Sequence, residues 1–179
     1  MGSNYKISYT VDMVFCIDCT GSMDNILEIV KNNALNFYND VVQSMSAKGK
    51  NVDKLRVRIV AFRDYIADGD NAMMVTDFFT LPDDAVNFER CVRSLVAKGG
   101  GDEPEDGLEA LAYAMRSNWN TEGMKKRQVI VVWTDASTHP LGYGARMHNY
   151  PQGMAGSMQE LTAWWGDKQN EGYVDQRAK

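Results

Sequence analysis

A nearly unbroken apolar run, residues 11–17, ends in an aspartate and gives way to a helical pattern. Such a run predicts a strand covered on both faces, as in the centre of a parallel sheet. The five residues that follow, D-C-T-G-S, contain one carboxylate, two hydroxyls, a thiol and a glycine. Oxygen atoms at alternate positions of a strand-to-helix turn suit a hard divalent cation such as Mg²⁺. Asp18, Thr20 and Ser22 are therefore candidate metal ligands.

The pattern of a buried strand ending in aspartate occurs again at residues 128–135, QVIVVWTD. Between the two runs, apolar periodicity predicts helices over residues 22–48 and 82–98 and a third that opens at Pro104. Alternating residues predict a further strand near residues 54–62, and residues 73–80 predict a short strand that pairs with it as a hairpin. A last helix is expected over residues 157–170, after a long irregular segment.

Strands that alternate with helices predict an α/β fold: a doubly wound, mostly parallel sheet with one short antiparallel edge strand and helices on both faces. In such sheets, ligands bind outside the carboxyl ends of the strands, where the strand order reverses. If the strands that end in Asp18 and Asp135 are neighbours, the two carboxylates meet in one crevice. The glycine-rich loop before Pro104 can reach the same edge of the sheet.

Composition sets the broad class of the protein. The 179 residues, 44% hydrophobic and 24% charged, are typical of one globular domain. We expect a lead-in over residues 1–8 and a single domain over residues 9–179. The net charge of −5 argues against nucleic-acid binding. The apolar runs are too short to cross a membrane, and the first ten residues lack the apolar core of a signal peptide, so a cytoplasmic location is expected.

Together these motifs resemble the von Willebrand factor A domain, over roughly residues 9–175. That family builds a metal-ion-dependent adhesion site from three loops, the first of which reads D-x-S-x-S. Here Asp18, Thr20 and Ser22 match the first loop, and Asp135 in W-T-D-A matches the third. Asp102, in G-G-G-D-E-P-E-D, falls where the family's second loop carries a threonine. The motifs look more like those of intracellular bacterial or phage members than those of animal adhesion receptors.

The resemblance implies a protein-interaction domain with Mg²⁺, or Mn²⁺ or Ca²⁺, at the carboxyl edge of the sheet. A protein partner would supply a carboxylate or another oxygen to the metal, and the loop at residues 137–156 would shape selectivity. The extra carboxylate of Asp102 would cancel part of the metal's charge and weaken its attraction for an acidic partner. The family's sheet normally has a further strand where this chain stops, which would fit a domain truncated at its C-terminus.

Two other functions compete with this interpretation. Phosphohydrolases of the haloacid-dehalogenase type use a D-x-D at a strand end, but Thr20 replaces the second aspartate here, so the general acid/base is missing. A structural domain with a vacant metal site is the other alternative. Locally, Thr20 and Ser22 could simply cap a helix, and Asp135 could cap a turn.

Other polar residues favour structural roles. Glu103 competes with Asp102 as a ligand, whereas Glu105 and Asp106 are expected in the first helical turn, where they would offset the helix dipole. Three further expectations concern the pairs and single residues that remain: an ion pair between Arg63 and Asp64, a core position for Cys19, and no zinc site at the distant pair His139 and His148.

Overall fold

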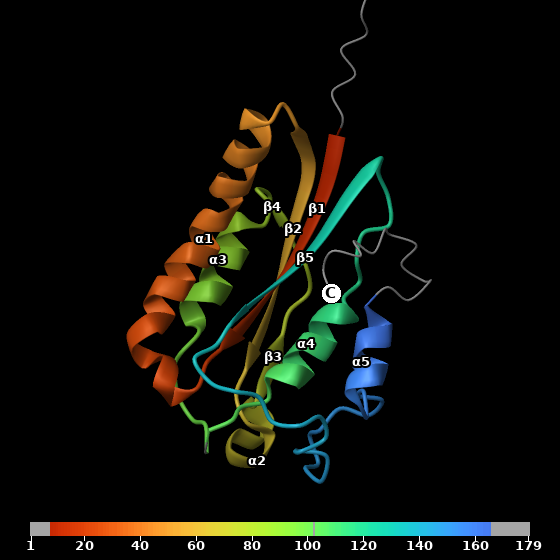
Figure 1. Cartoon of the computed structure of the whole chain (residues 1–179). Helices are drawn as coiled ribbons and strands as arrows, with labels where there is room; N and C mark the ends of the chain where they lie inside the picture. The colour runs from red at the N-terminus through yellow and green to blue at the C-terminus, as the bar shows by residue number, and fades with distance from the viewer. Residues whose placement is uncertain (1–7, 102, 166–179) are drawn as a thin grey trace, which may run out of the picture.

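In the computed structural model, which describes residues 8–101 and 103–165, helices cover both faces of a five-stranded sheet (Figure 1). The elements are β1 (Ser8–Asp18), a 3₁₀ turn η1 (Gly21–Met23), α1 (Asp24–Ala47), β2 (Asn51–Phe62), α2 (Tyr65–Asp68), η2 (Gly69–Asn71), β3 (Met73–Val75), β4 (Phe79–Leu81), α3 (Ala85–Ser94), α4 (Gly107–Met115), β5 (Lys125–Trp133) and α5 (Met158–Trp164). The predicted α/β class is therefore confirmed.

The sheet has the order β3-β2-β1-β5, and β4 pairs with another part of β2. β1 lies between β2 and β5 and runs parallel to both. At the carboxyl end, Asp18 is level with Phe62 of β2, and Ile17 is level with Trp133 of β5. The strands that lead to Asp18 and Asp135 are therefore neighbours, and both aspartates lie at one edge of the sheet.

The antiparallel part of the sheet differs from the expectation of one short strand over residues 73–80. Two strands of three residues each, β3 and β4, pair with β2 at residues 60–62 and 55–57. Thr76 separates them: its hydroxyl accepts a hydrogen bond from the Ile59 N–H, and the Thr76 N–H donates to the Ile59 carbonyl. The chain is thereby fixed to β2 at this point without continuing as a regular ladder.

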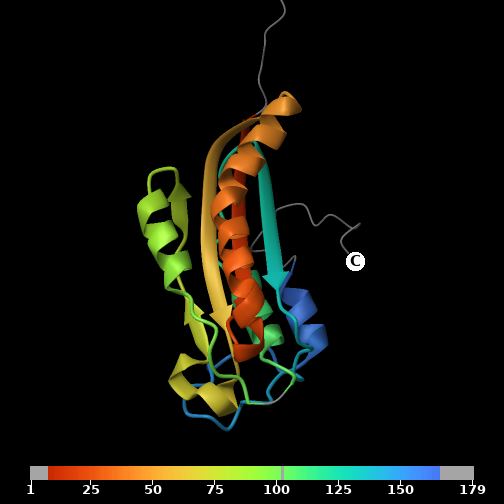
Figure 2. The same ribbon diagram turned by 90° about the vertical axis from the view of Figure 1, so that its left-hand side faces the viewer.

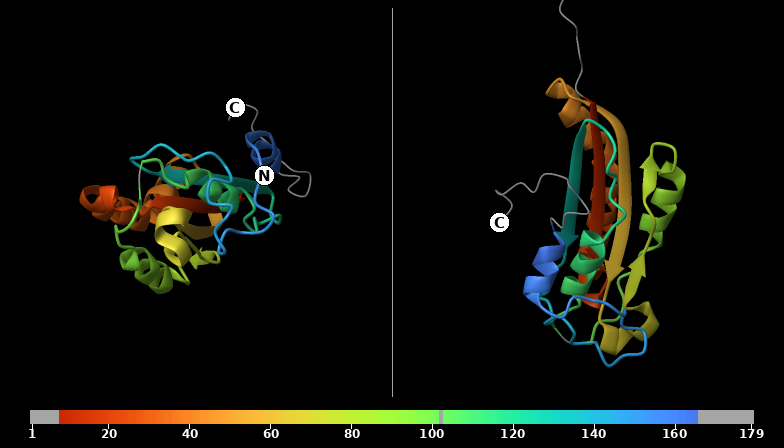
Figure 3. Two further views of the ribbon diagram at one scale, coloured as in Figure 1. Left: turned by 90° about the horizontal axis from the view of Figure 1, so that it is seen from below. Right: turned by 90° about the vertical axis from the view of Figure 1, so that its right-hand side faces the viewer.

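The core consists of two apolar layers, one on each face of the sheet. On one face, α1 and α3 pack against Met13, Phe15 and Ile17 of β1. On the other face, α4 packs against Val14 and Cys16, and α5 adds a smaller cluster beside α4. Figure 2 views the face under α1, and the right panel of Figure 3 views the face under α4 and α5. β1 is buried on both sides, as its unbroken apolar run predicts.

β5 is less buried than its sequence suggests. We expected a buried strand over residues 128–135, but β5 spans Lys125–Trp133, and most of its side chains are half-buried or exposed. Within the part of the chain that is described, β5 pairs with β1 alone, so it lies at the edge of the sheet. Asp135 follows two residues after the strand ends.

The helix boundaries also differ from the predictions. α3 ends at Ser94, before the predicted end at residue 98, and α4 begins at Gly107 instead of Pro104. The expected extension of the last helix to Asn170 and the lead-in before Ser8 lie outside the described residues. No helix in the described ranges combines the length and the apolar character needed to cross a membrane.

A buried ion pair fixes the amino end of the sheet. The Asp12 side chain, 2% exposed, accepts hydrogen bonds from Nε of Arg56 at 2.8 Å and from its Nη2 at 2.5 Å. The backbone N–H of Asn120 donates a third hydrogen bond to the Asp12 carboxylate, at 2.6 Å. The Arg56 guanidinium also lies 4.4 Å from the centre of the Phe78 ring. These contacts connect β1, β2, the segment after β3 and the chain that leads into β5.

Replacing Asp12 by alanine should lower the free energy of unfolding by about 3 kcal/mol, because Arg56 then loses its partner in a poorly hydrated place. Urea denaturation monitored by circular dichroism measures the change. Asp83→Ala, at an exposed position before α3, is the matched control and should stay within about 0.5 kcal/mol of the wild type. Equal losses for the two variants would show that the Asp12–Arg56 pair contributes no more than a surface carboxylate.

Candidate functional site

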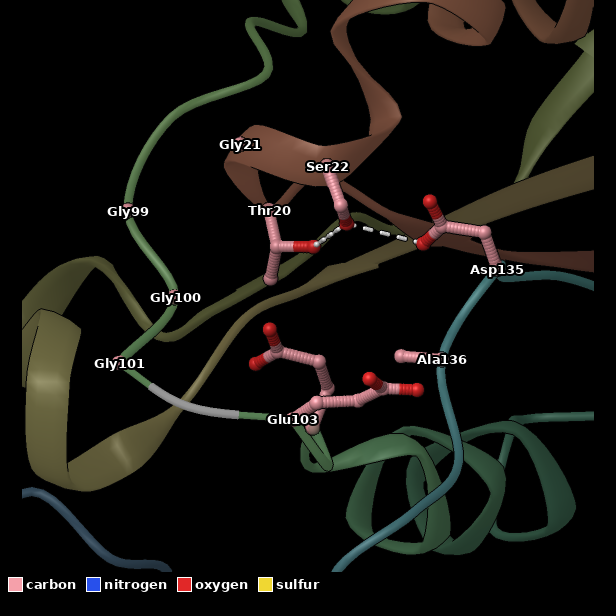
Figure 4. A pocket seen from close by; sticks show the side chains of 10 residues that line it. Thr20, Gly21, Ser22, Gly99, Gly100, Gly101, Glu103, Asp135 and Ala136 are labelled. Atoms are coloured by element: carbon pink, nitrogen blue, oxygen red, sulfur yellow. Dashed lines mark hydrogen bonds between the residues drawn. The ribbon is translucent and has the colours of Figure 1, made fainter.

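Three of the five predicted site residues meet at the carboxyl edge of the sheet (Figure 4). The Ser22 hydroxyl donates to Oδ1 of Asp135 at 2.9 Å, and its oxygen lies 3.2 Å from the hydroxyl oxygen of Thr20. Thr20 and Ser22 belong to the turn between β1 and α1, whereas Asp135 follows β5. Parallel pairing of β1 with β5 therefore unites oxygen atoms that are more than a hundred residues apart in sequence.

Asp18 lies beneath these three residues and is completely buried. Its Oδ1 accepts hydrogen bonds from the backbone N–H of Thr20 at 2.9 Å and from the Thr20 hydroxyl at 2.6 Å. Its Oδ2 accepts one from the hydroxyl of Thr134 at 2.7 Å. Asp18 thus fixes the Thr20 side chain and ties the first loop to the segment after β5. Cys19, next to it, is fully buried in the core, as expected.

The glycine-rich loop reaches the same edge, as predicted. The N–H of Gly21 donates to the carbonyl of Gly99 at 3.0 Å, so the loop lies directly against the turn after β1. Gly100 has a positive φ of 81°, and a β-carbon there would lie 2.8 Å from Oε1 of Glu105 and 3.1 Å from Cβ of Thr20. Glycine is therefore required at position 100 both by the backbone conformation and by this close approach. Asp102 lies outside the described residues.

Glu105 is the site residue that the sequence reasoning missed. It precedes α4 instead of lying in its first turn, so the expected role of offsetting the helix dipole is wrong for Glu105. Its N–H donates to the Ser137 carbonyl, and its own carbonyl accepts from the N–H of His139. The backbone of residue 105 is thereby paired with the segment after β5, which directs the side chain into the site.

The Glu105 carboxylate is 5% exposed, and its Oε2 has no hydrogen-bond partner in the structure. Burial, reinforced by the negative charges of Asp18, Asp64, Asp68 and Asp106, raises the pKa of Glu105 to about 8. The sequence signal that could have identified it is the number of carboxylates in G-G-G-D-E-P-E-D. Consecutive side chains in one helical turn point in different directions, so at least one of these carboxylates has to face the protein.

Two further buried carboxylates, Asp106 and Glu109, connect the start of α4 to α2 and the body of α4 to the loop over residues 137–156, respectively. Asp106 was also expected in the first helical turn, but it is buried and accepts a hydrogen bond from the N–H of Tyr65 at 2.6 Å. Burial raises its pKa to about 6, although the Tyr65 N–H opposes the shift. Glu109 is likewise buried and accepts from the Tyr150 hydroxyl at 2.8 Å and from the Gly142 N–H at 3.1 Å.

The expected ion pair between Arg63 and Asp64 is wrong. The Arg63 guanidinium donates instead to three backbone carbonyls, those of Cys19, Asn71 and Val96, at 2.8–2.9 Å. Asp64 caps α2 by accepting from two backbone N–H groups, and its Oδ2 lies 3.1 Å from Nε2 of His139. Arg63 therefore secures the loops around the site through their carbonyls, because two turns and the end of α3 converge on it.

The turn after β1, the glycine-rich loop, the residues before α4 and the segment after β5 enclose a pocket of about 310 Å³. Its lining consists of hydroxyls, carboxylates and glycine backbone, and contains no lysine, arginine or histidine: Thr20, Gly21, Ser22, Gly99, Gly100, Gly101, Glu103, Glu105, Asp135 and Ala136. In Figure 4, Thr20 and Ser22 point toward Asp135, and Glu103 lies on the opposite side of the pocket.

The donor atoms fit a hard divalent cation better than zinc. Hydroxyl and carboxylate oxygens suit Mg²⁺, Mn²⁺ or Ca²⁺, whereas zinc favours thiolate and imidazole ligands. The Oε2 atom of Glu105, which has no hydrogen-bond partner among the described residues, is a further oxygen at the pocket, and a cation there would favour its ionised form. Within residues 8–101 and 103–165, however, no group of three or more His, Cys, Asp or Glu side chains is close enough to hold a metal ion.

This chain is similar to parts of longer known proteins, of which one is a match in sequence and one a match in structure. An alpha-protein kinase, vwkA, of Dictyostelium discoideum is 26% identical over 148 residues, which is 83% of this chain and 22% of the kinase. The pilus adhesin SpaC of Lactobacillus rhamnosus GG is similar in structure, with a TM-score of 0.48 and 17% identity over 74% of this chain and 16% of the adhesin. The match thus spans less than a quarter of the length of either protein.

The family itself is established by sequence. The pattern of the von Willebrand factor A domain matches residues 12–142, which is more than half of the chain. The matched region begins in β1 and extends past Asp135, so it contains the strand-end aspartates, the glycine-rich loop and the pocket between them. The chain belongs to the von Willebrand factor A domain family.

Proposed function

We propose that this domain binds a protein partner through a divalent cation, Mg²⁺ in the first instance, held in the pocket at the carboxyl edge of the sheet. The observation that supports this most is the linked set of oxygens of Thr20, Ser22 and Asp135, which converge from two loops onto the pocket. Domains of this family typically mediate protein–protein interaction. A partner would contribute a carboxylate or another oxygen as the remaining ligand.

In this proposal, Thr20, Ser22 and Asp135 bind the cation directly. Asp18 acts from beneath, because its carboxylate holds the Thr20 hydroxyl at 2.6 Å. Asp102 stays a candidate ligand on the basis of its sequence position, and Glu105 would balance charge from across the pocket. A bound cation would attract an oxygen of the partner, while the protein's own residues fix the direction from which that oxygen approaches.

We propose a binding role for this domain instead of a catalytic one. Phosphate hydrolysis of the haloacid-dehalogenase type requires a strand-end aspartate free to attack, whereas both oxygens of Asp18 accept hydrogen bonds from Thr20 and Thr134. The pocket lining also has three carboxylates and no cationic side chain that would hold a phosphate. The kinase named among the relatives is more than four times longer than the matched region, and we assign no transfer reaction to this chain.

The loop over residues 137–156 would determine which partner is accepted. Its contacts with the buried carboxylate of Glu109 in α4 and with Asp64 hold it beside the pocket. His139 stacks on Tyr143 with 3.8 Å between the ring centres. A loop held in this way presents a fixed surface to a partner, which favours selective binding because little chain entropy is lost on association.

Adding Mg²⁺ to the metal-free protein should raise the melting temperature. At about 100 times its Kd, a ligand that binds only the folded state adds about 2.7 kcal/mol, which corresponds to roughly 5–10 °C for a domain of this size. Asp135→Ala should abolish the increase while the fold persists, because Asp135 is exposed and bound mainly through Ser22. Differential scanning calorimetry with and without chelator measures both effects.

Asp83→Ala is the matched control for the metal experiment, since it removes an exposed aspartate far from the pocket and should keep the full increase. A wild-type protein whose melting temperature is unchanged at millimolar Mg²⁺, Mn²⁺ and Ca²⁺ would refute the metal site. If Asp135→Ala binds the metal with unchanged affinity, the site exists but this ligand is wrong.

The metal-free domain should lose stability as the pH rises from about 4.5 to about 8. Glu105 has an ordinary pKa near 4.5 and a folded-state pKa of about 8, so the folded state keeps a proton in this interval that the unfolded state releases. Each rise in pH then favours unfolding, and the loss is complete above the folded-state pKa. Asp106, with a pKa of about 6, contributes in the lower part of the interval.

Glu105→Gln keeps the shape of the side chain but cannot titrate, so it should flatten the upper part of this pH dependence. Urea denaturation without metal at a series of pH values measures the slope. Glu122→Gln, at an exposed position before β5, should keep the wild-type slope. If Glu105→Gln and Glu122→Gln show the same pH dependence, Glu105 is charged in the folded protein at neutral pH and the raised pKa is refuted.

A further inference from the structure

We propose that the partner segment entering the pocket is basic: a lysine or arginine side chain pairs with Glu103 and Glu105, and a neutral oxygen of the same segment meets the cation. This rests on the proposed function and specifies the chemistry of its partner. A metal ion whose charge is not fully cancelled by its protein ligands would instead attract an acidic side chain of the partner.

The first argument is the balance of charge. Glu103, Glu105 and Asp135 line the pocket, and Asp18 lies directly beneath it. A cation in the pocket favours the ionised form of Glu105, and the four carboxylates then carry a formal charge of −4, against +2 for one divalent cation. No lysine or arginine is among the residues that line the pocket. A carboxylate from a partner would therefore enter a site that is already negative, whereas an ammonium or guanidinium group would be attracted.

The second argument is the unpaired oxygen of Glu105. Glu105 is 5% exposed and lines the pocket, and its Oε2 has no hydrogen-bond partner among the residues that the structure describes. A buried carboxylate oxygen without a donor is costly, and a lysine or arginine N–H from a partner would supply one. The backbone of Gly100 approaches the other oxygen of this carboxylate so closely that a β-carbon there would lie 2.8 Å from Oε1.

The third argument is the arrangement of the two carboxylates around the pocket. Thr20, Ser22 and Asp135 form one side of it, and Glu103 lies on the other (Figure 4). Glu103 is exposed, so it can meet a charged group that arrives from solvent. Glu105 is buried, so it would contact that group only after the group has entered the pocket. A pocket of about 310 Å³ has room for the end of a lysine or arginine side chain beside a cation. Metal and basic side chain would thus occupy different sides.

The experiment uses a phage-displayed library of random dodecamer peptides, selected on the immobilised whole chain with Mg²⁺ at physiological ionic strength. Selected peptides should be enriched in lysine and arginine relative to the unselected library. The affinity of the best synthetic peptide is then measured by isothermal titration calorimetry against three variants: Glu103→Gln, Glu105→Gln and Glu122→Gln. Each variant replaces one glutamate by glutamine, so the three differ only in the position of the carboxyl group that is lost.

Glu103→Gln should weaken binding roughly two- to fivefold, as expected for one exposed ion pair, and Glu105→Gln by roughly tenfold or more, because its partner group is buried. Glu122→Gln should bind as the wild type does, which excludes attraction to the overall charge of −5. Peptides enriched in aspartate or glutamate, or no enrichment in basic residues, would overturn the proposal. So would equal losses in all three variants.

The same measurements separate this proposal from the proposed function. Calorimetry is repeated with chelator, and the Mg²⁺-dependent melting temperature of each variant is recorded. If Mg²⁺ stabilises the protein but the selected peptides are acidic, the metal site stands and the basic partner is refuted. If basic peptides bind equally with Mg²⁺ and with chelator, and Mg²⁺ leaves the melting temperature unchanged, the pocket binds cations directly and the metal-bridged function fails.

Discussion

Parallel pairing of β1 with strands on both sides is the constraint on which the other features of this domain depend. β1 is apolar on both faces and lies between β2 and β5. Because both neighbours run in the same direction, the turns that follow all three strands open on one edge of the sheet. The hydroxyls of the first turn, the aspartate after β5 and the glycine-rich loop meet there. The ion pair of Asp12 and Arg56 holds the same strands together at the opposite end.

Several buried carboxylates lie in and around the resulting pocket. Asp18, Glu105, Asp106 and Glu109 are all at most 5% exposed, and none of them has an ion-pair partner among the described residues. Hydroxyl and backbone donors hold Asp18, Asp106 and Glu109 instead. Neutral donors fix a carboxylate without removing its charge, so the edge of the sheet stays negative. Partial protonation of Glu105 and Asp106 relieves part of this repulsion in the metal-free protein.

Membership of the von Willebrand factor A family explains the fold and the position of the site, but not which partner the site accepts. In our proposal, the acidic lining would disfavour a carboxylate from the partner, because a single divalent cation would not reverse the charge of the pocket. Selectivity by charge would then come from Glu103 and Glu105, while the loop over residues 137–156 would provide shape. The pairing of residue 105 with Ser137 and His139 connects the two, because it joins Glu105 to the start of that loop.

The sequence alone determined the alternation of strands and helices, the burial of β1 and the two strand-end aspartates, because these follow from local periodicity. It also identified Thr20 and Ser22, since they lie in the first turn after β1. The tertiary structure decided that β5 pairs only with β1 among the described residues, and that two short strands, β3 and β4, take the place of the single one expected. It also decided that Arg63 donates to backbone carbonyls and not to Asp64. It also decided the role of Glu105. A helix dipole is a local effect that sequence can suggest, whereas pairing of residue 105 with Ser137 and His139 is a long-range contact that no local pattern contains.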